Sequence, residues 1–230
     1  MGLFGIEKFT EPLGKALSVF DFSFFISGAA TMGGIALDMH YYGHDGPYAI
    51  GGWLGPALLI IATYICGLMS WSIGKTIRWW ILRLVLCEKD PVNADFERIY
   101  QESQYVLGNK KPHEAENTDV SMKHNIDYTS MWIVLEKNEK AAPRMTYMNK
   151  MWVMTAVFEG LITSWIVGLM VYLDGWLIGG WIKTECIIYN IIPIFILLAF
   201  VYVSFVRATE YARGLIREVI AAYHMYCEEH

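Results

Sequence analysis

The chain has 230 residues, of which 55% are hydrophobic and 15% aromatic, and its mean hydropathy is +0.32. A water-soluble domain cannot bury such a large apolar share, so the composition excludes an ordinary soluble protein. The net charge is −5 and the sequence carries no basic stripe, so it gives no direct signal of nucleic-acid binding.

Four long apolar segments predict transmembrane helices. Each has roughly the 20 residues that a helix needs to cross about 30 Å of hydrocarbon. Backbone polar groups in lipid must be satisfied within the segment, and the alternating pattern of a membrane barrel is absent. We therefore expect an all-α membrane protein with four spans: Leu17–Leu37, Tyr48–Ile73, Trp152–Leu173 and Ile187–Val206.

The positions of lysine and arginine predict the orientation of these spans. Basic residues cluster before the first span, after the second, before the third and after the fourth, whereas the two short outer loops contain only Lys183. We expect a multi-pass protein of the cell inner membrane with both termini cytoplasmic. This divides the chain into a cytoplasmic N-terminal segment (1–16), the first two spans (17–75), a cytoplasmic insert (76–150), the last two spans (151–206) and a cytoplasmic C-terminal helix (207–230).

The first half of the insert is predicted to be helical. Trp79–Leu86 continues the second span, either as an interfacial helix or as an extension below the bilayer, and Asp90-Pro91 breaks it. A second helix is expected from Asn93 to Gly108, with Phe96, Ile99 and Tyr100 on one side.

The second half of the insert is predicted to contain a loop and two strands. Lys110–Asp127 is polar and is expected to be a loop, whereas the apolar run Met131–Leu135 predicts a short buried strand. Arg144–Met148 is expected to return beside this strand. The insert is thus predicted to be a small mixed unit, too poor in apolar residues to fold alone.

The C-terminal helix 207–230 has an apolar stripe that needs a partner. Either the insert or another subunit can cover it. The stripe consists of Tyr211, Leu215, Ile216, Val219, Ile220 and Tyr223.

Two carboxylates lie inside apolar segments, Asp21 in the first span and Glu159 in the third. An ionisable group in a span costs a few kcal/mol on insertion scales, so it normally faces protein, water or an ion path. In a symmetric assembly the two residues can form acidic rings. The alternatives are that Asp21 is merely interfacial and that Glu159 hydrogen-bonds a neighbouring helix.

Small residues at four-residue spacing predict helix packing in the first and third spans, because they let another helix approach closely. A single copy can hardly cover all of these small-residue faces with its own helices, so we expect a homo-oligomer of three or more copies, and specifically a tetramer. The fourth span has few small residues and is expected to face lipid. The predicted packing residues are Ala29, Ala30, Gly33, Gly34, Gly160, Ser164 and Gly168.

No motif in the sequence predicts an enzyme, a metal site or another cofactor. His40 and His44, with Asp38 and Asp45 beside them, form the only cluster that resembles metal ligands, but the neighbouring glycines favour a loop without a second ligand set. Arg217 and His224 have the loose spacing of some ribonuclease pairs. A solvated helix face explains them better.

Two functions fit these features. The first is an oligomeric, channel-like effector in which Asp21 or Glu159 lines a cation path and a cytoplasmic protein or small signalling ligand controls the insert. The second is a non-conducting membrane sensor or anchor that recruits a cytoplasmic protein. In organisation, with four spans, the insert from Glu88 to Lys150 and Glu159, the chain resembles the small four-span components of the bacterial antiphage systems Kiwa and Hailong. The resemblance implies a membrane sensor or ion-channel effector that works beside a cytosolic partner.

Overall fold

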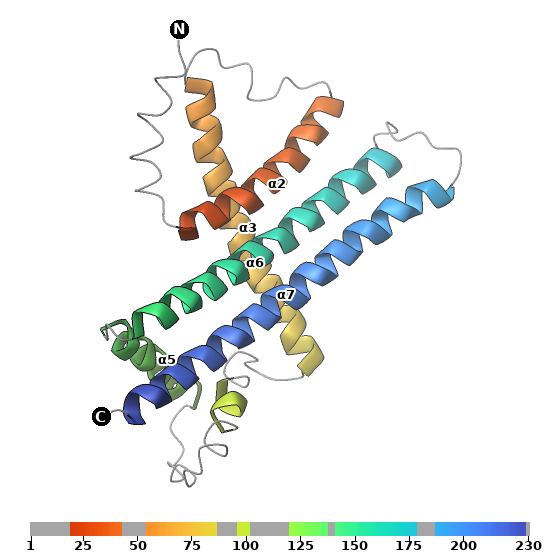
Figure 1. Cartoon of the computed structure of the whole chain (residues 1–230). Coiled ribbons are helices and arrows are strands. Elements are labelled where there is room, and N and C mark those ends of the chain that lie inside the picture. Colours follow the sequence, from red (N-terminus) through yellow and green to blue (C-terminus); the bar gives the residue numbers. More distant parts are fainter. Residues whose placement is uncertain are drawn as a thin grey trace. The chain divides into compact units, whose positions relative to one another are not determined.

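The computed structural model describes residues 19–42, 54–86, 96–101, 120–137, 141–178 and 187–228. Within these ranges the regular elements are helices (Figure 1). They are α2 (Val19–Tyr41), α3 (Leu54–Leu86), α5 (Val120–Glu136), α6 (Ala142–Leu177) and α7 (Ile187–Glu228), with a short helical segment at 96–101.

Three of the described helices are long and apolar enough to cross a membrane: Gly55–Val85, Ala142–Leu177 and Asn190–Met225. At about 1.5 Å per residue, helices of this length exceed the roughly 30 Å of a hydrocarbon core. The helical class of the prediction is confirmed, together with three of the apolar helices. A membrane span at α2 stays a prediction.

The helices belong to two compact units. Unit 1 contains Met1–Lys75 and Ala156–Ala208, and unit 2 contains Thr76–Thr155 and Thr209–His230. Helices α3, α6 and α7 each contribute residues to both. The assignment of these parts to membrane and cytoplasm stays a prediction.

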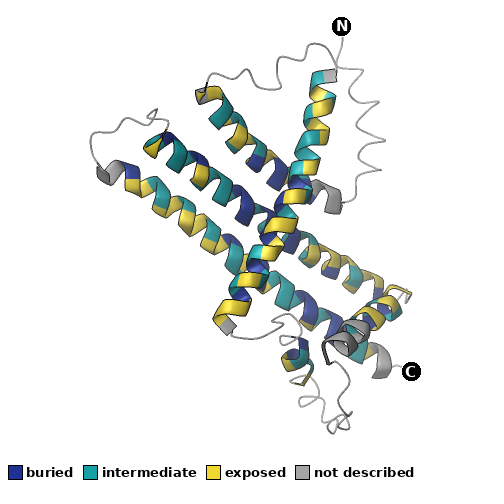
Figure 2. Cartoon of the chain, turned by 180° about the vertical axis from the view of Figure 1, so that it is seen from behind, coloured by how far each residue is buried: buried dark blue, intermediate teal, exposed yellow. Residues whose placement is uncertain are grey.

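In unit 1, α6 is the helix that other helices cover most. In the 18-residue stretch of high hydropathy within each helix, 39% of the stretch is buried in α6, 17% in α3 and 11% in α7 (Figure 2). Helix α7 packs on α6 through Trp165 and Phe200, whose stacked rings have centroids 4.8 Å apart. The other side of α7 exposes large apolar residues such as Phe195 and Tyr202, as expected for a helix that faces lipid.

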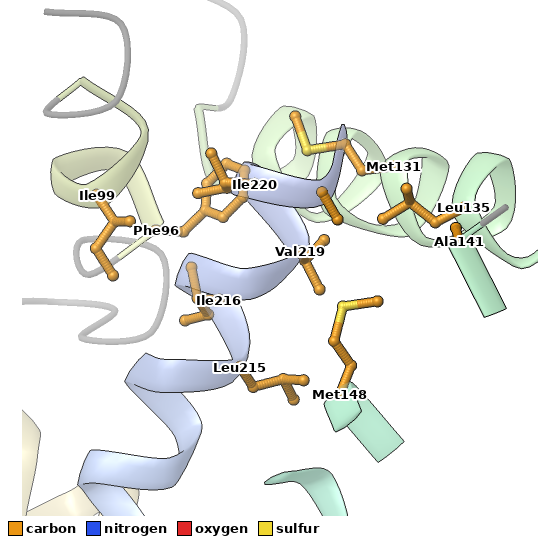
Figure 3. Close-up of a cluster of buried hydrophobic side chains, with 11 residues drawn as sticks. Phe96, Ile99, Met131, Leu135, Ala141, Met148, Leu215, Ile216, Val219 and Ile220 are labelled. Atoms are coloured by element: carbon orange, nitrogen blue, oxygen red, sulfur yellow. The ribbon is translucent and has the colours of Figure 1, made fainter. Parts of the chain in front are cut away.

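In unit 2, the apolar stripe of α7 lies at the centre of a hydrophobic core (Figure 3). Leu215, Ile216, Val219 and Ile220 are covered by side chains of the helical segment 96–101, of α5, and of residue 141 with the first turns of α6. The insert therefore covers the apolar stripe of the C-terminal helix. This is the first of the two alternatives predicted from the sequence, the second being another subunit. The covering residues are Phe96, Ile99, Met131, Leu135, Ala141 and Met148.

The prediction of a strand at Met131–Leu135 is wrong, because these residues lie in α5. Met131 and Leu135 are 7% and 1% exposed, whereas Ile133 between them is 44% exposed. A strand would place all three on one face, whereas a helix brings residues four apart together. A five-residue apolar run does not distinguish the two by itself.

Two other predictions for the insert change with this correction. Arg144–Met148 belongs to α6 and is not a return strand, and the expected loop ends where α5 begins at Val120. The described part of the insert is thus helical rather than mixed. The burial of Phe96 and Ile99 confirms the predicted apolar side of the second helix, whose predicted ends at Asn93 and Gly108 lie outside the described residues.

We expect Leu135→Ala to destabilise unit 2 by about 2–5 kcal/mol, because it removes a fully buried side chain and leaves a cavity. Ile133→Ala, two residues away on the exposed side of α5, should change stability by less than about 1 kcal/mol. Chemical denaturation of the full chain in detergent measures both. Equal losses for the two variants would contradict the helical register of α5.

Candidate functional site

The candidate site lies in unit 1, where α2, α3 and α6 approach so closely that glycine is needed at the contacts. A Cβ atom on Gly28 would overlap the carbonyl oxygen of Thr63, and one on Gly67 would overlap that of Phe24. About two turns further along the same side of α3, a Cβ on Gly74 would overlap the carbonyl oxygen of Glu159. Small residues permit this kind of backbone contact between membrane helices.

Side-chain hydroxyls bind the three helices together next to these glycines. Thr31 Oγ1 on α2 lies 2.9 Å from Ser70 Oγ on α3 and 2.9 Å from Ser164 Oγ on α6. Ser164 also donates to the carbonyl oxygen of Ser27, 3.0 Å away, and Thr163 donates to that of Ser70, 2.7 Å away. We call Ser27, Thr31, Ser70, Thr163 and Ser164 the hydroxyl cluster, and all five are buried.

Glu159 lies beside the hydroxyl cluster and is only 2% exposed. Its Oε2 atom accepts a hydrogen bond from Trp71 Nε1, at 2.8 Å. The Lys75 Nζ atom lies 5.4 Å from the centroid of the same indole ring. Trp71 thus connects a buried carboxylate on α6 to an exposed cation on its own helix, and the carboxylate takes part in packing within one copy of the chain.

The third-span packing residues contact two different helices. A Cβ on Gly160 would lie 2.5 Å from Ser27 Cβ, and Ser164 belongs to the hydroxyl cluster, so both lie against α2. Gly168 instead lies near α7, where a Cβ would be 3.8 Å from Leu197 Cδ2.

The first-span packing residues lie mostly on the uncovered side of α2. Ala29 and Ala30 are exposed, and a Cβ on Gly33 would have nothing within 4 Å. A Cβ on Gly34 would be 3.5 Å from Val167 Cγ1 on α6. A role for Ala29, Ala30 and Gly33 in packing between copies stays a prediction. Asp21 is part of α2, but its side chain lies outside the described residues.

The glycines and hydroxyls that make the contact were not predicted from the sequence. Gly28, Gly67 and Gly74 were not singled out, nor were Thr31, Ser70 and Thr163. A usable signal was present, because Ser27 and Thr31 lie one helical turn apart, as do Ser70 and Gly74. Polar and small residues on one helix side mark the side that faces other helices.

A second polar group lies where α2 and α6 end. The Tyr42 hydroxyl donates a hydrogen bond to Asp174 Oδ2, and this bond raises the pKa of Tyr42 above its ordinary value. Asp38 Oδ1 is buried nearby without a hydrogen-bond partner in the described structure. His44 and Asp45 lie outside the described residues. Among the residues that the structure describes, no group of three His, Cys, Asp or Glu side chains is placed to hold a metal ion.

The two residues weighed as a ribonuclease-like pair have different surroundings in α7. Arg217 is exposed, whereas the ring of His224 stacks on that of Tyr100 with centroids 6.0 Å apart.

No protein-family model, curated protein or solved structure matches the chain.

We expect Gly67→Ala to destabilise unit 1 by about 1–3 kcal/mol, because the new carbon meets backbone that can move only with its helix. Gly33→Ala on α2 is the matched control, with open space around the new carbon, and should leave stability unchanged or slightly raised. Thermal unfolding of the detergent-solubilised chain measures both. A loss at Gly33 equal to that at Gly67 would contradict the contact described for α2 and α3.

Proposed function

We propose that the chain is a multi-span inner-membrane sensor or anchor that receives a cytoplasmic partner protein and does not conduct ions through the Glu159 site. The observation that carries the proposal is the burial of Glu159 against Trp71. A carboxylate that attracts permeating cations has to face water or the ion path. Glu159 instead accepts a hydrogen bond within one copy.

The surroundings of Glu159 support this reading. The carbonyl of the same residue touches α3 at Gly74, without room for a side-chain carbon. Thr163, one turn further along α6, donates to the backbone of α3. Polar groups that are satisfied this way hold helices together in a medium that offers them no water. The cost of placing a carboxylate in an apolar helix is thereby offset by packing, without a requirement for conduction.

The proposal includes α2 as the fourth span. This helix has 23 residues, which is enough to cross a bilayer at about 1.5 Å per residue. Its serine and threonine residues lower its hydropathy, yet Ser23, Ser27 and Thr31 are buried. With four spans, the lysine and arginine distribution favours cytoplasmic termini and a cytoplasmic unit 2.

Unit 2 is the part proposed to meet the partner. It has its own apolar core, so it can present a folded surface rather than a flexible loop. Tyr147 on α6 is 50% exposed at this unit, and aromatic side chains of this kind are enriched in protein interfaces. The resemblance of organisation to antiphage membrane components agrees with such a role and supports defence as the setting.

The second candidate is an oligomeric pore that forms between copies. The uncovered side of α2 favours it, because Ala29, Ala30 and Gly33 allow a second copy to approach closely. A tetramer would bring four such faces together. In that arrangement the conduction path would lie between protomers, and the side chain of Asp21 rather than that of Glu159 would be the acidic group to test.

We expect Glu159→Gln to leave membrane permeability unchanged. The amide oxygen can still accept from Trp71, so shape and packing are kept while the charge is removed. Cells that express equal amounts of wild type and variant are compared with a potential-sensitive dye, with cells lacking the protein as the control. A dye response that requires wild-type protein and falls in Glu159→Gln would favour the pore and refute the anchor.

A photo-crosslinking amino acid at Tyr147 should yield one protein adduct of defined mass in cells, because this residue is exposed on unit 2. The same amino acid at Phe195, exposed on the apolar side of α7, is the control and should yield no such adduct. The adduct is identified by mass spectrometry. A ladder of this chain with itself at Tyr147, and no other protein, would speak against partner recruitment at this surface.

A further inference from the structure

Helix α3 continues without a break beyond the segment needed to cross a bilayer. It has 33 residues and ends at Leu86. Its last part, from Trp79 to Val85, carries three large apolar side chains on its surface, Trp80 at 53% exposed, Leu84 at 71% and Val85 at 72%. We call Trp79–Val85 the terminal segment of α3. Such apolar exposure at one helix end is unfavourable in water.

The charges of α3 are all positive. Lys75, Arg78 and Arg83 are its ionisable cations, and no aspartate or glutamate occurs from Leu54 to Leu86. Arg78 is buried, whereas Arg83 is exposed. Exposed apolar residues next to a cation, on a helix that itself contains no acidic residue, match a surface that is apolar and negatively charged.

Arg83 is held in a particular position by Trp79. Its guanidinium carbon lies 5.1 Å from the centroid of the Trp79 ring, one helical turn earlier. An arginine that stacks on an indole keeps N–H groups directed outward, where they can bind a phosphate through two parallel hydrogen bonds. The ring of Trp79 also packs edge-to-face on that of Trp80, with centroids 5.9 Å apart.

We propose that the terminal segment of α3 docks in the headgroup layer of a membrane leaflet, where Arg83 binds the phosphate of an anionic lipid. Along this unbroken helix, Trp79 and Trp80 lie at the boundary between acyl chains and headgroups, and Leu84 and Val85, about one turn further out, lie within the headgroup layer. Tryptophan is enriched at this level of membranes because its ring is both apolar and polar. The segment forms the last part of the apolar helix Gly55–Val85, which favours a bilayer over a protein as its partner.

This proposal rests on the membrane insertion of α3 and not on the recruitment of a partner. It combines the two descriptions of Trp79–Leu86 that the sequence left open. The segment is a helical extension of α3, as the structure shows, and by our proposal it is also interfacial. The lipid should be anionic, since a zwitterionic headgroup adds no net charge to attract Arg83.

The test measures the binding of fluorescent phosphatidylglycerol and phosphatidylcholine to the full chain in detergent micelles. We expect preferential binding of phosphatidylglycerol and a loss of about fivefold in its affinity in Arg83→Gln, from the value of one basic residue near a charged surface. Arg83→Lys keeps the charge and should lose less. Arg217→Gln, at an exposed arginine of α7, is the matched control and should bind as wild type does.

Three results would overturn the proposal. The first is equal binding of the two lipids, and the second is equal affinity of wild type and Arg83→Gln for phosphatidylglycerol. The third is complete displacement of phosphatidylglycerol by millimolar inorganic phosphate, which would indicate a site for the free ion. Circular dichroism of each variant checks the helical fold, and Trp79→Leu, which removes only the stacking ring, should weaken binding less than Arg83→Gln does.

Discussion

A hydroxyl or carboxylate that is buried away from water must find its hydrogen-bond partner inside the protein, and unit 1 is arranged around that requirement. Gly28, Gly67 and Gly74 bring the backbones of three helices close enough for short side chains to bridge them. Thr31 then reaches α3 and α6 at once. Close contact and polar pairing depend on each other, since a larger side chain at the glycines would separate the hydroxyls.

The remaining helix surfaces follow from this arrangement. Because α6 receives contacts from α2, α3 and α7, few of its residues are left for lipid, whereas α7 meets α6 on one side and exposes Phe195 and Tyr202 on the other. In unit 2 the same helix α7 has the opposite role, with Val219 and Ile220 at the centre of a core. One continuous helix thus lies at the outside of one unit and at the centre of the other.

The sequence predicted the coarse features well, because long apolar runs and positive mean hydropathy leave few alternatives to membrane helices. It predicted the apolar stripe of α7 as well, since the six residues of the stripe recur at helical spacing. The prediction of a strand at Met131–Leu135 was wrong because a run of five apolar residues fits the periodicity of a strand and that of a helix equally well. Packing against α7 decides between the two structures. At the candidate site, Glu159 was found from its charge, whereas its donor Trp71 lies 88 residues away in the chain and no local pattern connects the two.

The hydrogen bonds of Thr31 join helices that are synthesised at very different times. Helices α2 and α3 are separated in the chain by one short connection, whereas α6 follows only after the whole insert. The contact of Gly28 with α3 and the bond from Thr31 to Ser70 need only α2 and α3. Ser164 and Thr163 follow later in the chain, and each donates to a backbone carbonyl of α2 or α3. The contacts between α2 and α3 can therefore form before α6 is synthesised, whereas the bonds of Thr163 and Ser164 can form only after it.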